Sequence, residues 1–189
     1  SSRQRLAVSV LPTFGSQWLI PRLADFCAQS PGVDVQISTT GSVLDFDPAE
    51  HDIAIRCLSD EDIVNLRKRP QWKDVEIVPF LPDGMTVVCS PSLLAKHPLP
   101  WSPAQWAKLT LLHSKSTPMA WNAWLASAGL NKVKANKAVT FDHGNMAVLA
   151  AGQGMGLAMT APAMCADAVA SGLLAVPFPD HVIFPKQNC

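Results

Sequence analysis

Residues 5–39 read RLAVSVLPTFGSQWLIPRLADFCAQSPGVDVQIST, and this stretch sets the fold class. Its first part, residues 6–11, alternates apolar and small polar side chains, which predicts a β-strand. Apolar residues at helical spacing come next and predict a helix, although Pro21 means that this helix either starts late or kinks in its first turns. Residues 33–38 then alternate again and predict a second strand. The stretch is a strand–helix–strand unit.

The same alternation of strands and helices continues along the chain. Helix starts are predicted where a serine or threonine precedes a proline, at Ser90-Pro91, Ser102-Pro103 and Thr117-Pro118. Gly129 is well placed to end a helix in a left-handed turn. Further helices are expected at residues 145–151 and 161–171, and further strands at residues 52–57, 75–80, 85–89, 110–113, 137–141, 155–159 and 173–178. Strands that alternate with helices through short loops imply an α/β fold of parallel sheets with helices on both faces. The rhythm breaks at residues 81–84, which suggests a crossover between two lobes.

The composition indicates a folded chain without a nucleic-acid surface of its own. The 189 residues suffice for one large domain or two small lobes, and 48% of them are hydrophobic. Fifteen basic residues balance fifteen acidic ones, and the densest basic run, Arg67-Lys68-Arg69, is too short to follow a DNA backbone. We therefore expect that this part of the protein does not contact DNA directly.

The cysteines and the apolar runs predict a cytoplasmic protein. The five cysteines are far apart and odd in number, and no Cys-x-x-Cys pair occurs, so a disulfide framework is not expected. We see no secretory leader and no apolar stretch near the roughly 20 residues that a bilayer crossing requires.

Four polar turns follow predicted strands and are the candidate ligand contacts. They lie at residues 13–16, 39–42, 113–117 and 142–145, and all are rich in hydroxyl and amide groups. Doubly wound sheets bind ligands outside the carboxyl ends of their strands, where such groups can hold a carboxylate or an amide. The same residue types are also ordinary helix caps and turn residues, so each turn taken alone has a structural interpretation as well.

The motifs that accompany catalysis are missing. The chain contains no Gly-x-Ser-x-Gly elbow, no phosphate-binding loop and no His-Glu-x-x-His. The run Gly152-x-Gly154-x-Gly156 precedes a predicted strand, so it is no dinucleotide fingerprint. His113, His143 and Asp142 could form an acid–base group, but a histidine near a strand end is more often structural. We predict no catalytic residue, no metal site and no cofactor.

Several stretches, taken together and in order, resemble the effector-binding domain of LysR-type transcriptional regulators. The likeness is greatest to the subgroup that contains the glycine-cleavage activator and the regulator of inducible β-lactamase. The stretches are RLAVSVLPTFGSQWLIPRLADFCAQSPGVDVQIST, DPAEHDIAIRC, VVCSPSLL, LTLLHS, WNAWLASAG and FDHGNMAVLAAGQGMGLAMTAPAMCADAVASGLLAVPF.

The resemblance implies two Rossmann-like lobes joined by crossover strands, the arrangement of type II periplasmic binding proteins. Residues 1–81 and 181–189 would form regulatory subdomain I, without the family's closing helix, and residues 82–180 would form regulatory subdomain II. A small-molecule effector, an acid or an amino-acid-like compound, would sit between them. The resemblance also implies a homodimer or homotetramer that pairs through the helix near residues 17–28. DNA would be bound through an N-terminal helix-turn-helix that this chain lacks.

The resemblance also implies which residues contact the effector. Arg56 is the most informative, because a guanidinium can hold a carboxylate through two hydrogen bonds. The alternative is that Arg56 pairs with Asp45, Asp47 or Asp60. Gly144-Asn145 departs from the family pattern, since a hydroxyl is expected there. The expected effector contacts are Thr13, Phe14, Ser16, Thr40, Ser42, Arg56, His113, Ser114, Asp142 and His143.

A second class of protein fits the same architecture. The solute-binding protein of a transporter has two such lobes and also performs no chemistry. A helix-turn-helix in the sequence upstream would favour the regulator, and a leader peptide would favour the transporter.

Overall fold

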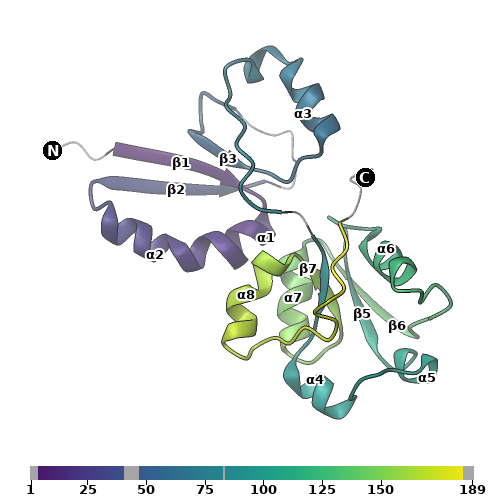
Figure 1. The fold of residues 1–189 in the computed structure, drawn as a ribbon. Helices are drawn as coiled ribbons and strands as arrows, with labels where there is room; N and C mark the ends of the chain where they lie inside the picture. Colours follow the sequence, from purple (N-terminus) through teal and green to yellow (C-terminus); the bar gives the residue numbers. More distant parts are fainter. Residues whose placement is uncertain (1–3, 41–46, 83, 185–189) are drawn as a thin grey trace. The chain divides into compact units, whose positions relative to one another are not determined.

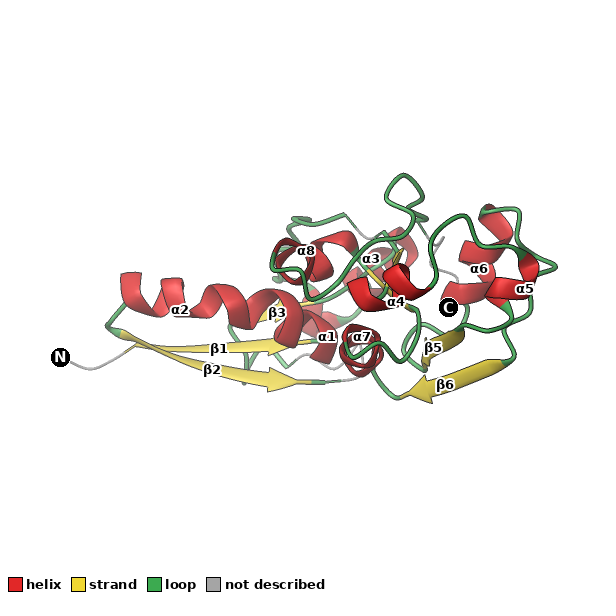
Figure 2. Cartoon of the chain, turned by 90° about the horizontal axis from the view of Figure 1, so that it is seen from below, coloured by secondary structure: helices red, strands yellow, loops and turns green. Residues whose placement is uncertain are grey.

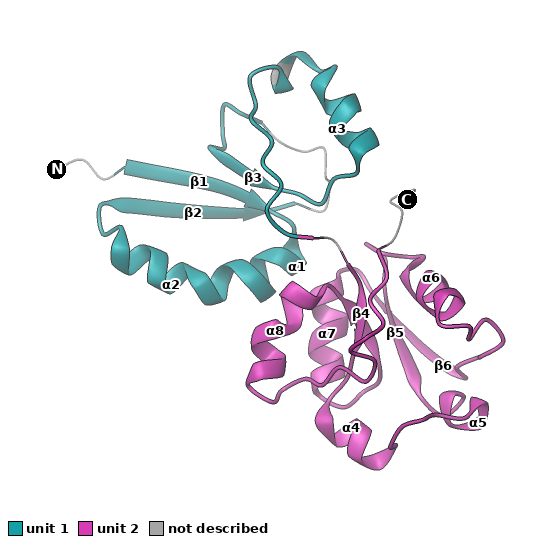
Figure 3. Cartoon of the chain, viewed as in Figure 1, with its two compact units in different colours: residues 1–81 teal, residues 82–189 magenta. Residues whose placement is uncertain are grey.

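The computed structural model describes residues 4–40, 47–82 and 84–184, leaving aside the side chain of Gln71. The chain divides into two compact units, Ser1–Leu81 and Pro82–Cys189 (Figure 3). The described end of the chain belongs to the second unit, although we expected residues 181–189 in the first lobe. Ile183 exchanges two backbone hydrogen bonds with Met85, of 2.7 and 3.0 Å, and is buried there.

Unit 1 contains a parallel sheet of three strands in the order β2-β1-β3. The strands are β1 (Gln4–Val10), β2 (Val33–Thr39) and β3 (Ile53–Ile55), and Figure 1 shows them running in the same direction. Val10 pairs with Thr39 on one side and with Ile55 on the other, so the carboxyl ends of all three strands meet at one edge. The strand–helix–strand prediction for residues 5–39 is confirmed.

The helical stretch after β1 starts earlier than Pro21 suggested. It runs through α1 (Pro12–Phe14), a π-helical turn η1 (Gly15–Leu19) and α2 (Ile20–Gln29), and it lies alongside the β1–β2 pair (Figure 2). A proline inside a regular α-helix removes one hydrogen bond and clashes with the preceding turn. The π turn ends at Leu19, and Pro21 lies in the first turn of α2, where a proline is tolerated.

The second half of unit 1 differs most from the predictions. Residues 75–80 form no strand, and the side chains of Val78 and Phe80 are exposed. A helix that we did not predict, α3 (Asp60–Arg67), begins at Ser59, whose hydroxyl accepts from the Asp62 N–H while the Asp62 carboxylate accepts from the Ser59 N–H. The short 3-10 helix η2 (Pro70–Trp72) follows it.

The described residues of unit 2 form four strands: β4 (Thr86–Val88), β5 (Thr110–Ser114), β6 (Lys137–Phe141) and β7 (Ala158–Thr160). β5 and β6 are parallel, and a parallel bridge between Leu111 and Leu157 joins β5 to β7. β4 and β7 are antiparallel, so the sheet arrangement of unit 2 is mixed, whereas the alternation of strands and helices implied parallel sheets. Of the strand expected at residues 173–178, a single bridge between Ala175 and Cys89 is present.

The helices of unit 2 lie where the proline pairs and the apolar spacing predicted them, with one exception. Ser90 and Ser102 cap α4 and α5 through their hydroxyls, and Gly129, with φ 71°, follows α6. α6 starts later than Thr117-Pro118 suggested, with Met119 at its N-cap position and no capping side chain. The bounds are α4 (Pro91–Lys96), α5 (Pro103–Trp106), α6 (Ala120–Ser127), α7 (Gly144–Gly152) and α8 (Pro162–Ala170).

The core of unit 2 has two faces because neighbouring strand residues point to opposite sides of a sheet. Val87 and Leu111 pack into one cluster, which also contains Trp101, Trp106, Trp121 and Trp124. Val88 and Leu112 pack into the other cluster, with Ala147, Val148 and Ala151 of α7 and Cys165 of α8. Helices therefore cover both faces of these strands, and α7 begins at the edge where β6 ends.

Candidate functional site

The carboxyl edge of the unit 1 sheet gathers three of the predicted contacts. Thr13 follows β1, Thr40 follows β2 and Arg56 follows β3. The Thr40 N–H donates to the Val10 carbonyl oxygen at 3.1 Å, which holds the end of β2 against the end of β1. All three side chains are half-buried, so this edge carries two hydroxyl groups and a guanidinium that are partly accessible.

Arg56 is fixed by hydrogen bonds to the sheet itself. Its Nη1 donates to the carbonyl oxygens of Ser9 at 2.8 Å and Ile55 at 2.9 Å, and its Nη2 donates to the Ser9 hydroxyl at 2.7 Å. Ser9 lies inside β1 and is only 2% exposed. The guanidinium therefore ties β3 to β1 and brings a positive charge to the carboxyl edge.

Phe14 and Ser16 have structural roles that the sequence did not reveal. Phe14 is buried and stacks on Trp18, with ring centroids 5.0 Å apart, and it meets the edge of Phe80 at 5.9 Å. The Ser16 hydroxyl donates back to the carbonyl oxygens of Pro12 and Thr13, as helical serines often do. Ser42 lies outside the described residues.

The carboxyl edge of β5 and β6 in unit 2 gathers the other four predicted contacts. Ser114 and Phe141 pair at the ends of these parallel strands, and the next backbone hydrogen bond joins the Lys115 N–H to the Phe141 carbonyl oxygen at 2.9 Å. Asp142 and His143 continue from β6 into α7, and His143 is the N-cap residue of that helix. The N-terminus of α7 therefore lies at this edge, and its N–H groups favour a negative partner.

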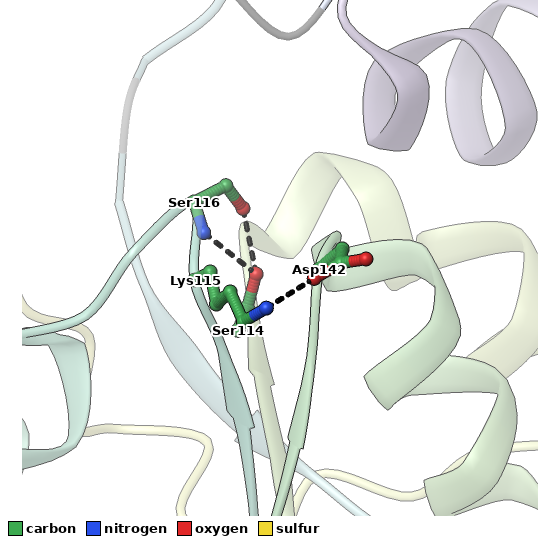
Figure 4. Close-up of polar contacts among 4 residues, drawn as sticks. All are labelled: Ser114, Lys115, Ser116 and Asp142. Atoms are coloured by element: carbon green, nitrogen blue, oxygen red, sulfur yellow. Dashed lines mark hydrogen bonds and ion pairs between the residues drawn. The ribbon is translucent and has the colours of Figure 1, made fainter.

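Ser114 is held in place inside the loop that follows β5. It is buried, its hydroxyl lies 2.6 Å from the Ser116 hydroxyl, and it accepts from the Ser116 N–H at 3.2 Å (Figure 4). Ser116 itself is exposed. This pair of hydroxyls is an acceptor and donor group that suits a neutral polar ligand atom.

Lys115 and Asp142 form an ion pair across the two strand ends (Figure 4). The Lys115 Nζ lies 2.7 Å from the Asp142 Oδ1, and the side chains are 69% and 70% exposed. The hydrogen bond from Lys115 and its charge lower the pKa of the Asp142 carboxyl, and the same contact raises the pKa of Lys115. Both charges stay ionised at neutral pH, so the edge presents an anion and a cation together.

The two histidines are half-buried beside this ion pair. Burial lowers the pKa of His113, which lies in β5 with its ring 6.5 Å from that of Trp121. The His143 side chain makes no hydrogen bond to the first turn of α7. The Asp142 carboxylate pairs with Lys115, in agreement with our interpretation of these histidines as structural residues and not as an acid–base group.

The arrangement can bind a polar ligand, and it carries no chemistry of its own. Ser114 hydrogen-bonds to another serine, and such a contact does not activate a nucleophile. Within residues 4–40, 47–82 and 84–184, no group of three or more His, Cys, Asp or Glu side chains could hold a metal ion. None of the described helices combines the length and the apolarity that a bilayer crossing requires.

Three residues that shape these strand edges were not predicted from the sequence. Ser9 is a buried strand residue whose importance comes from its contact with Arg56, 47 positions away. Lys115 and Ser116 lie inside the polar loop at residues 113–117 but were not singled out. The ion pair could have been predicted, because a basic residue directly follows one strand and an acidic residue directly follows the neighbouring strand.

The comparisons with known proteins agree along almost the whole chain. The model of the LysR substrate binding domain matches residues 1–186. The chain is similar to the glycine cleavage system transcriptional activator of Escherichia coli (strain K12), with 31% identity over 183 residues, 97% of this chain and 56% of that protein. It is 32% identical to the transcriptional activator AmpR of Pseudomonas aeruginosa over 182 residues, 95% of this chain and 56% of that protein. The chain therefore spans about half the length of the curated relatives it matches.

The solved structures show the same likeness. The effector domain of AmpR from Pseudomonas aeruginosa superposes with a TM-score of 0.69 and 31% identity, covering 96% of this chain and 81% of that domain. The regulatory domain of CrgA from Neisseria meningitidis gives a TM-score of 0.65 at 19% identity, which supports the fold.

Proposed function

Because the chain belongs to the LysR substrate binding domain family, we propose that it binds a small-molecule effector through polar side chains at the ends of its strands. The chain is an effector-sensing domain with the α/β fold of type II periplasmic binding proteins, and the family is not enzymatic. The observation that carries the proposal is the family match over residues 1–186 combined with polar side chains at the carboxyl edge of each sheet. The transporter alternative loses its support, since the relatives that cover the chain are regulators.

The charges at the two edges favour an effector that carries a carboxylate. Arg56 supplies a cation at the edge of unit 1, and unit 2 supplies the ion pair of Lys115 and Asp142 beside the N-terminus of α7. A zwitterion such as an amino acid can use both signs of charge, because its carboxylate suits a cation and its ammonium suits an anion. We propose an acid or an amino-acid-like effector contacted by Thr13, Thr40, Arg56, His113, Ser114, Asp142 and His143.

A thermal-shift screen tests this proposal. Amino acids, small carboxylates and cell-wall fragments are added to the purified chain, and the unfolding temperature is measured. A ligand present at 100 times its Kd stabilises the folded state by about 2.7 kcal/mol. A genuine hit should lose its effect in Asp142→Asn and Ser114→Ala, and should keep it in the exposed control Arg69→Ala. If no compound of these classes raises the unfolding temperature, the proposed effector class is wrong.

The longer protein that contains this chain is proposed to regulate transcription as a cytoplasmic homodimer or homotetramer, with DNA bound by a segment outside this chain. The two curated relatives described above are transcriptional activators, each about twice as long as the matched region. The α2 helix supports self-association, because none of its residues is buried and its Ile20 and Phe26 side chains are 58% and 40% exposed. Light scattering tests this, since Phe26→Glu should convert an oligomer into a monomer while Arg69→Ala should not.

A further inference from the structure

Unit 2 contains a cavity of about 240 Å³ that is open to solvent on the side of the exposed residues Pro162, Ala166 and Pro179, and that is separate from the candidate effector contacts. None of the ten residues predicted to contact the effector lines it. The cavity lies between α8, the start of β4 and the stretch that leads to Ile183, all within unit 2. Its lining residues are Thr86, Pro162, Cys165, Ala166, Val169, Val176, Pro179 and Val182.

The lining of this cavity is apolar and uncharged. Three valines, two prolines and one alanine supply most of it. The Cys165 thiol adds no charge either, because burial raises its pKa and it donates to the Pro162 carbonyl oxygen at 3.4 Å. A charged ligand would lose its hydration here without gaining a partner, so the lining selects for a neutral molecule.

One polar group at the cavity wall has no partner within the described residues. Thr86 is 2% exposed, and its buried hydroxyl makes no hydrogen bond to any described residue. Buried hydroxyls almost always have a partner, and one without a partner is costly. The hydroxyl oxygen has almost no accessible surface, so a bond to a ligand in the cavity requires the Thr86 side chain to turn to another staggered rotamer.

We propose that this cavity is a binding site for a small, neutral, largely apolar molecule with a single hydroxyl group. The volume suits one aromatic ring, because an apolar cavity of about 150 Å³ already holds benzene. The apolar walls would bind the ring, and the Thr86 hydroxyl would pair with the hydroxyl of the ligand. Ligand sites of this kind are mostly apolar, with a few polar groups that fix the orientation.

The cavity lies beside the segment through which the chain enters unit 2. Thr86 lies five residues after Leu81, the last residue of unit 1. A ligand against Thr86 and Val182 therefore packs on the segment through which the chain enters unit 2. This site is independent of the proposed effector site, because the two share no residue.

The experiment uses the complete 189-residue chain with labelled methyl groups and two probes of nearly equal size, phenol and toluene. Each probe is titrated while the methyl NMR signals of valine and alanine are followed. The signals of Val169, Val176 and Val182 should shift in a saturable way with both probes, and the signals of unit 1 should stay unchanged. Shifts that do not saturate, or that appear only outside the cavity, overturn the proposal.

Two sets of variants test where the probes bind and whether the Thr86 hydroxyl contributes to the binding. Ala166→Phe places a ring at the cavity and should abolish saturable binding of both probes. The control Ala170→Phe adds the same ring to α8 at a residue that does not line the cavity, so it should leave the binding of both probes unchanged. Thr86→Val keeps the shape and removes the hydroxyl, so phenol should bind about 3- to 10-fold more weakly and toluene equally well or better. Unchanged binding in Ala166→Phe, or equal losses for both probes in Thr86→Val, would contradict the assignment.

Discussion

Replacing Arg56 with alanine removes the side chain that ties the ends of β3 and β1 together. Two of its hydrogen bonds cross between the strands, to the carbonyl oxygen of Ser9 at 2.8 Å and to the hydroxyl of Ser9 at 2.7 Å. Ser9 is almost completely buried, so water cannot easily replace the guanidinium as its partner. Arg56→Ala should therefore destabilise unit 1 in addition to removing a cation from the candidate site.

The size of the effect follows from these contacts. A hydrogen bond to a charged group contributes about 1.5–3 kcal/mol, so two such bonds contribute about 3–6 kcal/mol when fully buried. Arg56 is half-buried, and partial hydration of its partners reduces the expected loss to about 2–4 kcal/mol. Arg56→Lys should lose less, because one ammonium can keep part of the charge-assisted contact but cannot reproduce the fork of the guanidinium.

Urea unfolding of the 189-residue chain, followed by circular dichroism, measures this loss. With a slope of about 2 kcal/mol per molar urea, the midpoint should fall by about 1–2 M in Arg56→Ala. The exposed Arg69→Ala should stay within about 0.5 kcal/mol of the unchanged protein. Ser9→Ala combined with Arg56→Ala should show a coupling energy of about 0.5–3 kcal/mol.

One result would refute the reasoning. If Arg56→Ala and Arg69→Ala unfold at the same urea concentration, the bonds to Ser9 contribute nothing to stability. Any loss of effector response in Arg56→Ala would then come from the missing ligand contact alone.

Three further outcomes follow from buried groups elsewhere. Gly156→Ala should lower the free energy of unfolding, measured in urea, by more than about 3 kcal/mol, because the new Cβ would collide with a backbone carbonyl of β5. In the control Gly32→Ala the new Cβ meets no atom within 4 Å, so this variant should be neutral or slightly stabilised. Burial raises the pKa of Cys89 to about 11 and also raises the pKa of Cys165, so both thiols stay protonated at pH 8. If the native chain is alkylated at pH 8 and analysed by mass spectrometry, Cys89 and Cys165 should stay unmodified, whereas the exposed Cys27 and Cys57 should react. Burial lowers the pKa of His113 below its usual 6.5, so the unfolded chain takes up a proton at a higher pH than the folded chain does. The free energy of unfolding should therefore fall as the pH drops from 6.5 toward the pKa of the folded state. Urea midpoints measured at pH 7.5 and 5.5 should show this loss, and His113→Gln should remove the part that comes from His113.

The order of elements could be predicted from the sequence wherever strands bury residues on alternate sides. β1 and β2 were found for this reason, and the serine caps located α4 and α5. The pattern failed at residues 75–80, because apolar alternation produces a strand only when a neighbouring backbone is available, and Val78 there is 65% exposed. α3 was missed because its apolar stripe is weak, although the capping pair of Ser59 and Asp62 was a readable signal.

The candidate site could be predicted as a set of positions but not as a set of contacts. Polar turns at strand ends follow from topology alone, so Thr40, Arg56 and Asp142 were placed at the correct sheet edges. The partner of each side chain depends on strand register and on residues far away in the sequence. The bond from Arg56 to Ser9 spans 47 positions, and the pair of Lys115 and Asp142 spans 27, from 115 to 142.

The two candidate edges differ in how much change they can tolerate, and this difference bears on how effector specificity could evolve. In unit 1 the charged group is also part of the framework, because Arg56 holds β3 to β1, so altering it costs stability. In unit 2 the charges of Lys115 and Asp142 are about 70% exposed, and exposed ion pairs contribute little to stability. A regulator that sits only a few kcal/mol above its stability limit can exchange the second pair far more easily than the first. Under the proposed function, the residues after β5 and β6 can therefore change with the effector at little cost in stability, whereas a change at Arg56 destabilises the sheet of unit 1.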